Sequence, residues 1–398
     1  MPSLLFITIF ILWLLSALAD YGQFCYVWQL KEYRFDRLGD YISTLSGKKF
    51  FLGWRVLNRS FIYVVLFLLL PINLSSLNII IATFLFIDLL YNLSLFFSHN
   101  LSRPKLTIKA AALIVLAVII DGVLFFSFFN SGLIFIVLAL RWITFSILAI
   151  AAKLPTGIAK IFYLEIAKNK LLKFNKLTII GVTGSYGKTT VKNFLTQVLS
   201  AKYKVIMTPA NINTEIGVAK FILKNDFSDY DIFVVEMGTY KIGEIAKLCK
   251  MVKPKVGILT VINEQHLSLF KNIKNTQTAK YELLRSLPVD GLAITNSDNE
   301  YCREFLGELK CKVKTFGQLA NYNPDCLISD ISTGADKLEF KANEQLIKTN
   351  IIGAHNAMNI APVIITANYL GLNEEEIAKA CLNLALPSFL SHYCYEQA

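Results

Sequence analysis

The chain has 398 residues, of which 54% are hydrophobic and 17% are charged, and its mean hydropathy is +0.49. This composition excludes an ordinary soluble protein and predicts membrane segments, which are concentrated before about residue 152. The net charge of +11 fits basic loops and lipid contact, and no interleaving of aromatic and basic residues predicts a nucleic-acid partner. Seven cysteines without a Cys-x-x-Cys pair argue against disulfides or zinc and favour a reducing compartment for the soluble half.

Five apolar runs in the N-terminal part predict about five transmembrane helices. The first lacks a basic leader and an Ala-x-Ala exit, so we expect a retained helix rather than a cleaved signal peptide. The second and third are separated by PINLSS, which predicts a helical hairpin. The runs are 4–19, 61–74, 77–97, 110–129 and 133–152.

Loop charges predict the orientation of these helices. Basic residues gather between the first and second runs, between the third and fourth, and after the fifth. An outside N-terminus places all of them, and the soluble half, in the cytoplasm, which makes the chain a multi-pass protein of the cell membrane. Four helices with an interfacial first segment are the alternative. The loop charges are Lys31, Arg34, Arg37, Lys48, Lys49, Arg55, Arg59, Arg103, Lys105, Lys109, Lys153 and Lys160.

Three ionisable residues, Asp88, Asp121 and Arg141, fall inside the apolar runs. Such groups are costly in lipid and are often functional. An internal Asp–Arg pair that locks the bundle is the simpler interpretation, and a transport or lipid-handling role is the other.

The pattern changes after residue 170, where short apolar runs alternate with segments of helical length. The runs KLTIIGV (176–182), KVIM (204–207), DIFVVEMG (231–238), VGILTVIN (256–263) and LAITN (292–296) predict a mostly parallel, doubly wound sheet. Residues 326–353 alternate with period two and contain turn residues, which predicts a few appended antiparallel strands. The expected fold class is therefore an α-helical membrane bundle followed by an α/β P-loop domain.

The stretch GVTGSYGKTT (181–190) follows the first of these strands and opens a helix, which is the context of a phosphate-binding loop. Glycines let backbone N–H groups approach phosphates, and the helix N-terminus favours negative charge. Lys188 would reach the terminal phosphates of ATP, and the Thr189 hydroxyl would bind Mg²⁺. The predicted ATP-binding residues of this segment are Thr183, Gly184, Ser185, Tyr186, Gly187, Lys188, Thr189 and Thr190.

The first glycine stands one residue earlier than in the usual loop, and this form, GxTGSxGKTT, resembles the Mur ligase family of ATP-dependent amide ligases of peptidoglycan synthesis. The details are most similar to the branch that adds D-alanyl-D-alanine to UDP-N-acetylmuramoyl-tripeptide. Six further segments match in the expected order, and the resemblance covers about residues 176–387. They are NINTEIG (211–217), VVEMGTYKIGEI (234–245), PKVGILTVINEQHLSLF (254–270), TAKYELL (278–284), ITNSDN (294–299) and GAHNAMNIAPVIITANYLG (353–371).

The resemblance implies roles for further residues. Glu236, at a strand end, and His266 would be metal ligands, and Lys280, carbamylated by CO₂, would bind a second Mg²⁺. Lys188, Lys280 and His266 would be catalytic, and Asn356 and Asn359 would line the adenine pocket. Alternatives are a solvated strand-end carboxylate for Glu236, a packed loop histidine for His266, a surface lysine for Lys280, and a local hydrogen-bond network for the two asparagines.

The implied reaction joins a UDP-muramoyl-peptide to D-Ala-D-Ala through an acyl phosphate. The expected organisation is a membrane region (1–152), a linker (153–175), the central ATP-binding domain (176–387) and a truncated or aberrant tail (388–398), where Ser388-Phe389 replaces an Arg-containing motif. By this organisation we expect no counterpart of the family's UDP-sugar domain or of its C-terminal domain within these 398 residues. The alternatives are a catalytically incomplete ATP-binding membrane protein, which a partner in trans completes, and a related ligase acting on folate, polyglutamate or cyanophycin-like substrates. An ATP-driven transporter is disfavoured because no LSGGQ-like signature follows the loop.

Overall fold

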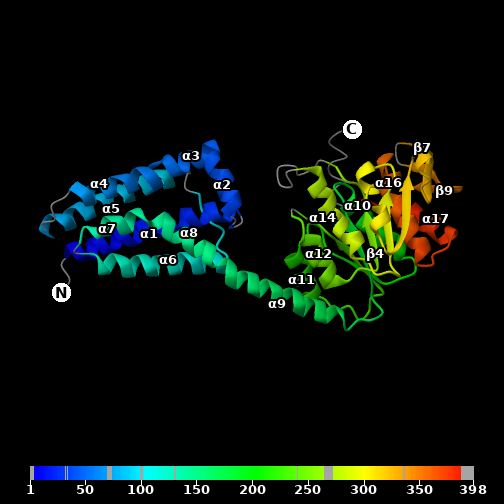
Figure 1. Cartoon of the computed structure of the whole chain (residues 1–398), viewed down its shortest axis with the longest axis horizontal. Coiled ribbons are helices and arrows are strands. Elements are labelled where there is room, and N and C mark those ends of the chain that lie inside the picture. Colours follow the sequence, from blue (N-terminus) through cyan, green and yellow to red (C-terminus); the bar gives the residue numbers. More distant parts are fainter. Residues whose placement is uncertain are drawn as a thin grey trace. The chain divides into compact units, whose positions relative to one another are not determined.

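The chain forms two compact units, Met1–Ile158 and Ala159–Ala398. The computed structural model describes residues 4–31, 33, 35–69, 74–98, 102–129, 131–239, 241–263, 272–334 and 337–386. The first unit consists of helices, and the second is built around a sheet (Figure 1). The expected fold class is therefore confirmed.

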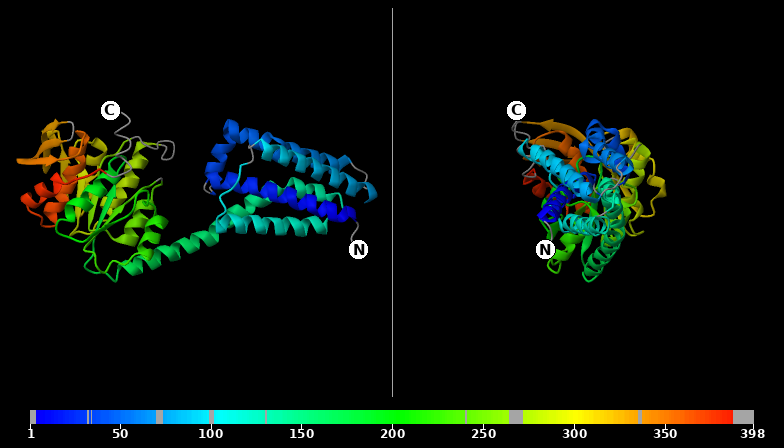
Figure 2. Two further views of the ribbon diagram at one scale, coloured as in Figure 1. Left: turned by 180° about the vertical axis from the view of Figure 1, so that it is seen from behind. Right: turned by 90° about the vertical axis from the view of Figure 1, so that its left-hand side faces the viewer.

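The first unit packs its helices around α1, whose buried face carries large aromatic side chains. α1 contacts α5, α6 and α8 along its length, and Trp13, Tyr21, Phe24 and Trp28 lie in the common core. The helices run side by side in both views (Figures 1 and 2). Their bounds are α1 (Leu4–Leu30), α2 (Phe35–Ser43), α3 (Leu45–Leu52), a π-helix (Trp54–Asn58), α4 (Arg59–Leu69), α5 (Leu74–Phe97), α6 (Ile108–Ser127), α7 (Leu133–Ala139) and α8 (Arg141–Ala151).

Five helical stretches of the described residues are long and apolar enough to cross a membrane, judged by length and composition alone. They are Leu4–Leu30, Leu45–Leu68, Leu77–Phe97, Ile108–Ser127 and Arg141–Leu171. The number agrees with the prediction, but three bounds differ: the first helix continues to Leu30, the second stretch begins near Leu45, and the fifth run is not one helix. The orientation across a membrane remains a prediction.

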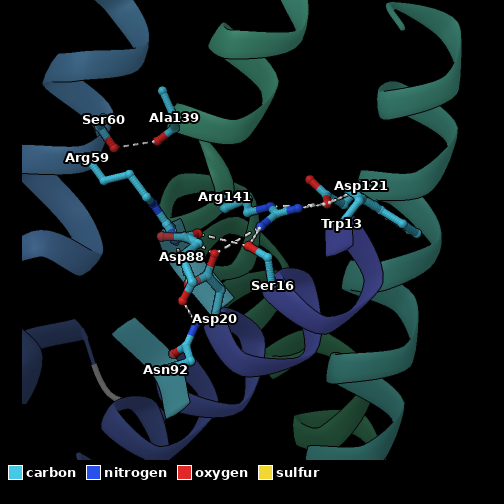
Figure 3. A network of polar contacts seen from close by, with 10 residues as sticks. All are labelled: Trp13, Ser16, Asp20, Arg59, Ser60, Asp88, Asn92, Asp121, Ala139 and Arg141. Atoms are coloured by element: carbon cyan, nitrogen blue, oxygen red, sulfur yellow. Dashed lines mark hydrogen bonds and ion pairs between the residues drawn. The ribbon is translucent and has the colours of Figure 1, made fainter. Parts of the chain in front are cut away.

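The fifth apolar run is interrupted at Leu140, which separates α7 from α8. The Ser60 hydroxyl of α4 donates to the Ala139 carbonyl oxygen at 2.9 Å (Figure 3). That carbonyl oxygen would otherwise accept the helical N–H of the residue four positions on. A side chain that bonds to a backbone carbonyl oxygen of the helical hydrogen-bond series is a recognised cause of helix breaks. Here that side chain, Ser60, belongs to a helix about eighty residues away in sequence.

A buried ion-pair network joins the helices of the first unit (Figure 3). Arg141 contacts Asp121 at 2.8 Å and Asp20 at 3.0 Å, and Arg59 contacts Asp20 at 2.7 Å and Asp88 at 2.5 Å. All five side chains are at most 4% exposed. Asp20 is shared by both arginines, so the network links α1, α4, α5, α6 and α8. The Asp–Arg pair expected from the sequence is therefore part of a larger cluster.

Arg59 was expected in a basic loop, and that placement is wrong. It begins α4 and is 3% exposed, because the preceding residues are helical and carry it into the bundle. Asp20 was expected just beyond the end of the first helix, yet α1 continues for ten more residues. Burying these groups is tolerable because each is paired with a group of opposite charge.

The second unit contains a nine-stranded sheet in the order β2-β3-β1-β4-β5-β6-β7-β8-β9. Neighbours from β2 to β7 are parallel, and β7-β8-β9 are antiparallel. β1 lies between β3 and β4, at the point where the strand order reverses, and such points form ligand crevices at the carboxyl ends of strands. The strands are β1 (Thr178–Thr183), β2 (Val205–Met207), β3 (Ile232–Glu236), β4 (Val256–Leu259), β5 (Leu292–Asn296), β6 (Lys312–Gly317), β7 (Cys326–Thr333), β8 (Leu338–Ala342) and β9 (Gln345–Thr349).

Helices cover both faces of this sheet (Figures 1 and 2). α10 (Lys188–Leu199), α16 (His355–Tyr369) and α17 (Glu374–Leu382) pack in one core, and α11 (Glu215–Lys224), α12 (Glu244–Val252) and α14 (Ile273–Arg285) pack in the other. The short α15 (Glu300–Arg303) follows β5. Both faces are buried, which explains why the parallel strands read as continuous apolar runs.

The segment 153–175, expected as a linker, is mostly the helix α9 (Lys153–Leu171). Its Ala167 and Leu171 side chains belong to the same core as α11 and α12. The C-terminal part of α9 is therefore part of the second unit. The expected tail, 388–398, lies outside the described residues.

Candidate functional site

The loop between β1 and α10 requires glycine at two positions. Gly184 has φ +151° and Gly187 has φ +79°, conformations that other residues rarely adopt. A Cβ at Gly184 would lie 1.9 Å from Thr260 Oγ1, and one at Gly187 would lie 2.6 Å from Asn359 Oδ1. The Ser185 N–H donates to the Val261 carbonyl oxygen at 2.7 Å. The backbone therefore turns tightly at the carboxyl end of β1, and glycine alone fits.

α10 begins directly after this turn, at Lys188. The first N–H groups of a helix have no partner inside it and carry a partial positive charge. The N–H groups of Lys188, Thr189 and Thr190 are in this position, whereas Val191 N–H already bonds to the Gly187 carbonyl oxygen at 2.8 Å. The turn and the helix start together form a cradle suited to an anion.

Two lysines from different elements meet at this cradle. Lys188 Nζ donates to the Gly184 carbonyl oxygen at 2.8 Å and to that of Ser185 at 3.2 Å. Lys280 Nζ, from α14, donates to the same Gly184 oxygen at 2.9 Å. Among the described residues neither ammonium forms an ion pair with a carboxylate. Two lysines that meet without an ion-paired carboxylate among the described residues make the loop a candidate site for an anionic group.

Burial and neighbouring charges shift the pKa values of both lysines. Burial, together with the smaller effect of the charge of Lys188, lowers the pKa of Lys280 to about 7. Burial also lowers the pKa of Lys188, against a smaller raising effect of Glu236. A bound polyphosphate would reverse these shifts, because an opposite charge favours the protonated form.

Glu236 ends β3 and forms the centre of a second polar cluster beside the loop. Its Oε2 accepts from Thr189 Oγ1 at 2.9 Å and pairs with Lys192 Nζ at 3.1 Å, and its Oε1 accepts from Asn213 Nδ2 at 3.2 Å. The register Val182↔Glu236 on neighbouring parallel strands places the carboxylate level with the end of β1. Glu236 is 3% exposed, so it is not a solvated strand-end carboxylate.

The residues around Glu236 fit a magnesium nucleotide only in part. A threonine hydroxyl beside a carboxylate supplies oxygen ligands of the kind that Mg²⁺ takes, with phosphate and water filling the other positions. Lys192, 1% exposed, neutralises the same carboxylate. No group of three metal-binding side chains of the His, Cys, Asp or Glu type occurs in the described part of the chain. His266, the expected histidine ligand, falls in 264–271, which the structure does not describe.

The two asparagines of α16 differ in their surroundings. Asn359 lies beside the phosphate-binding loop, since its Oδ1 would meet a Cβ at Gly187. Asn356 is 2% exposed, and its side chain is engaged within the protein: it donates to the Ile352 carbonyl oxygen at 2.8 Å and accepts from Asn359 at 3.0 Å. Asn359 therefore faces the loop, and Asn356 positions Asn359.

The structure thus gathers most residues of the predicted site around the loop, from four elements that are distant in sequence. Thr183, 0% exposed, donates to the Met237 carbonyl oxygen at 2.9 Å and joins β1 to β3, and Tyr186 is 53% exposed at the rim. Sequence reasoning missed Lys192, Asn213 and Thr260. Asn213 lies in the matched NINTEIG segment (211–217) and Thr260 in the matched segment 254–270, and these matches could have identified them, whereas Lys192 carries no distinguishing local pattern. The binding and catalytic roles remain predictions.

Comparison with known proteins agrees with this architecture. Residues 182–367 match the family model of the Mur ligase middle domain. UDP-N-acetylmuramoyl-tripeptide–D-alanyl-D-alanine ligase of Bacillus subtilis is 32% identical over 208 residues, which are 52% of this chain and 44% of the relative. The enzyme of the same name from Synechocystis is 34% identical over 212 residues, 53% of this chain and 44% of the relative. The chain therefore spans less than half the length of these curated relatives.

A solved structure shows the same fold. MurF of Acinetobacter baumannii superposes with a TM-score of 0.54 at 25% identity, covering 57% of this chain and 51% of that one. The likeness covers the half of the chain that holds the loop, Glu236 and Lys280.

Proposed function

We propose that this chain, which contains a Mur ligase middle domain at residues 182–367, is a membrane-attached, ATP-dependent amide ligase of peptidoglycan precursor synthesis. The specific reaction that we propose is the addition of D-alanyl-D-alanine to a UDP-muramoyl-tripeptide. The observation that carries the proposal is the convergence of Lys188 and Lys280 on one carbonyl oxygen, 2.8 Å and 2.9 Å away, without an acidic partner among the described residues. The relatives of similar sequence carry this activity in their names.

The proposed reaction has two steps. A carboxylate oxygen of the muramoyl peptide bonds to the γ-phosphorus of ATP while the bond to ADP breaks, which gives an acyl phosphate. The amine nitrogen of the dipeptide then bonds to the acyl carbon, loses a proton, and inorganic phosphate leaves. Both steps move negative charge among phosphate oxygens, so fixed positive groups at those oxygens lower the barrier.

This chain supplies such groups at the loop. The first N–H groups of α10 and the ammonium of Lys188 would hold the phosphates, and Asn359 would border the nucleotide. When bound, Mg²⁺ neutralises charge on the phosphate oxygens. Thr189 and Glu236 would hold one ion, and His266 and a carbamylated Lys280 would complete the metal ligands that the family resemblance implies. A neutral amine is the form that reacts with CO₂, and the low pKa of Lys280, about 7, supplies it near neutral pH.

A phosphate-release assay with the full chain in lipid vesicles tests the proposal. Release that requires ATP, a UDP-muramoyl-tripeptide and D-alanyl-D-alanine together supports the ligase. ATP binding without release indicates an ATP-binding protein that does not turn over alone, and release with a different acid and amine indicates another ligase of the superfamily. Lys188→Ala must abolish any release that belongs to this site.

We also propose that the second unit faces the cytoplasm. ATP is a cytoplasmic substrate, and the basic loops of the membrane region favour that side. Protease protection in intact and broken spheroplasts tests it: the second unit should be digested only after the membrane is broken.

A further inference from the structure

Helix α9 carries an apolar face that no described residue of the second unit covers. Ile161, Phe162 and Ile166 are 69%, 66% and 55% exposed. Phe162 and Ile166 are one helical turn apart. Ile161 lies about 100° around the helix from Phe162, within the half of the helix surface opposite Ala167 and Leu171. No other helix in the described part of this unit exposes three large apolar side chains to this extent. Single exposed apolar residues are ordinary on a protein surface, but a contiguous group marks an interaction site.

The opposite face of α9 is fixed to the second unit. Lys160 forms an ion pair with Glu215 of α11, and Lys170 donates to two carbonyl oxygens at the end of α11, at 2.6 Å and 3.0 Å. Ala167 and Leu171 are 0% and 6% exposed and lie in the core. From Lys160 onward, α9 is therefore packed against protein along one side. Lipid cannot surround it, and only the apolar face is available to another surface.

The charge around α9 identifies the chemistry of that surface. Residues 153–176 contain six lysines and one acidic residue, Glu165, which pairs with Lys168 at 2.6 Å. Lys153, Lys173 and Lys176 are exposed. Apolar side chains on one face of a helix flanked by lysines are typical of a helix that lies in the interface of an anionic membrane.

By composition alone, the stretch Arg141–Leu171 qualifies as a membrane span. The packing of α9 argues against a membrane span that includes α9, because a spanning helix has no charged face bound to a folded domain. The apolar stretch that leads into α9 also places membrane-compatible sequence immediately before the exposed face. Both observations favour lipid over a second protein as the occupant.

We propose that α9 is an interfacial helix, with Ile161, Phe162 and Ile166 inserted at the boundary between headgroups and acyl chains of an anionic bilayer. The exposed lysines contact lipid phosphates. The second unit thereby has a membrane contact of its own, in addition to the helices of the first unit. This inference does not depend on which reaction the loop catalyses.

Site-specific quenching in the full chain tests the proposal. Phe162→Cys is labelled with an environment-sensitive fluorophore in vesicles that contain one third phosphatidylglycerol, in a Cys394→Ser background. The other six cysteines are buried and leave the introduced thiol as the reactive one. Val289→Cys, at a position that is 74% exposed, is the matched control. Lipids with a nitroxide on the acyl chain report membrane contact, and iodide reports contact with water.

We expect the label at residue 162 to be quenched by the nitroxide lipid and to be at least about fivefold less sensitive to iodide than the label at residue 289. Nitroxide quenching should weaken in vesicles of phosphatidylcholine alone. Equal iodide quenching at residues 162 and 289 would overturn the proposal, and shielding from both quenchers would overturn it in favour of a protein contact such as a second copy. Ile166→Cys repeats the measurement in case Phe162→Cys does not fold. Phosphate release is not part of the readout, so failure of the ligase assay and failure of this inference are distinguishable.

Discussion

Lys188 and Lys280 donate to the same acceptor, the carbonyl oxygen of Gly184, although they are 92 residues apart in the chain. One begins the helix after β1, and the other lies on α14 across the site. Lys280 is 7% exposed and Lys188 is partly buried, and each has its pKa lowered by that burial. Two cations that share one acceptor repel each other, and a bound anion, the loss of a proton or a chemical modification would each reduce that repulsion.

Lys188→Ala should weaken ATP binding by at least about tenfold, since it removes a charge-assisted contact to the phosphates. Binding of a fluorescent ATP analogue to the full chain in detergent measures this. Lys348→Ala, at a lysine whose side chain is 52% exposed on strand β9, is the matched loss of a lysine and should leave the affinity unchanged. Equal affinity of both variants would contradict the assignment of the loop.

Gly187→Ala should abolish ATP binding for two separable reasons: the added Cβ lies 2.6 Å from Asn359 Oδ1, and φ +79° is unfavourable for alanine. Asn359→Ala in the same chain relieves the collision, removes the contact by which Asn359 would border the nucleotide, and leaves a conformational cost of about 1 kcal/mol at residue 187. Partial recovery of binding in the double variant is therefore expected. Gly307→Ala, where nothing lies within 4 Å, is the control.

Lys280 should form a carbamate, whose yield rises as the pH increases through about 7. The direction of the pH dependence follows from the lowered pKa of Lys280. The neutral amine is the form that reacts with CO₂, and in the folded protein it predominates above pH about 7. An ordinary lysine is mostly neutral only above pH about 10.4. Nuclear magnetic resonance after addition of ¹³C-bicarbonate measures it. Lys280→Gln should lose the signal, and Lys348→Ala should keep it. A signal of equal size in Lys280→Gln would contradict the prediction.

Glu236→Gln should destabilise the second unit and remove the Mg²⁺ dependence of ATP binding. Lys192, 1% exposed, would lose the carboxylate that neutralises it, at a cost of about 3–5 kcal/mol. The double variant Lys192→Met/Glu236→Gln should recover stability without recovering the Mg²⁺ dependence. Limited proteolysis of the second unit measures its stability, and ATP titrations with and without Mg²⁺ measure the Mg²⁺ dependence of ATP binding. Recovery of both by the double variant would show that Glu236 is purely structural.

Arg141→Leu should sharply reduce the yield of folded protein, because Asp121 loses its arginine and Asp20 keeps only Arg59. Breaking a buried ion pair from one side costs several kcal/mol. Asp88→Asn should be milder, since the network holds three carboxylates and two guanidinium groups. Size-exclusion chromatography of both variants in detergent measures the difference. Normal folding and normal phosphate release by Arg141→Leu would contradict a locking role and a functional role together.

The glycine-containing loop after β1 was predictable because its cause is local. Glycine at positive φ, a preceding β-rich run and a following helix are all visible in ten consecutive residues, and the order of the later segments identified the middle domain. The appended antiparallel strands were predictable for a similar reason, since alternation along residues 326–349 follows from one buried face. The apolar runs likewise predicted long apolar helices from composition, although three bounds differ and the fifth run is not one helix.

The other features of the fold and the site depend on contacts between residues that are far apart in the sequence. Lys192 is one lysine among many until packing buries it against Glu236, 44 residues away. Arg59 looked like a loop charge, and it entered the bundle because Asp20 and Asp88 of other helices meet it there. The break at Leu140 coincides with a hydroxyl from another helix that bonds to the backbone. The free face of α9 became visible only when its other face was found bound to α11. The sequence by itself determined the elements, the loop and the middle domain, since these arise from interactions between near neighbours. Only the tertiary structure decided which charges are paired and which surfaces are left open, because pairing and exposure arise between residues that the chain brings together from far apart.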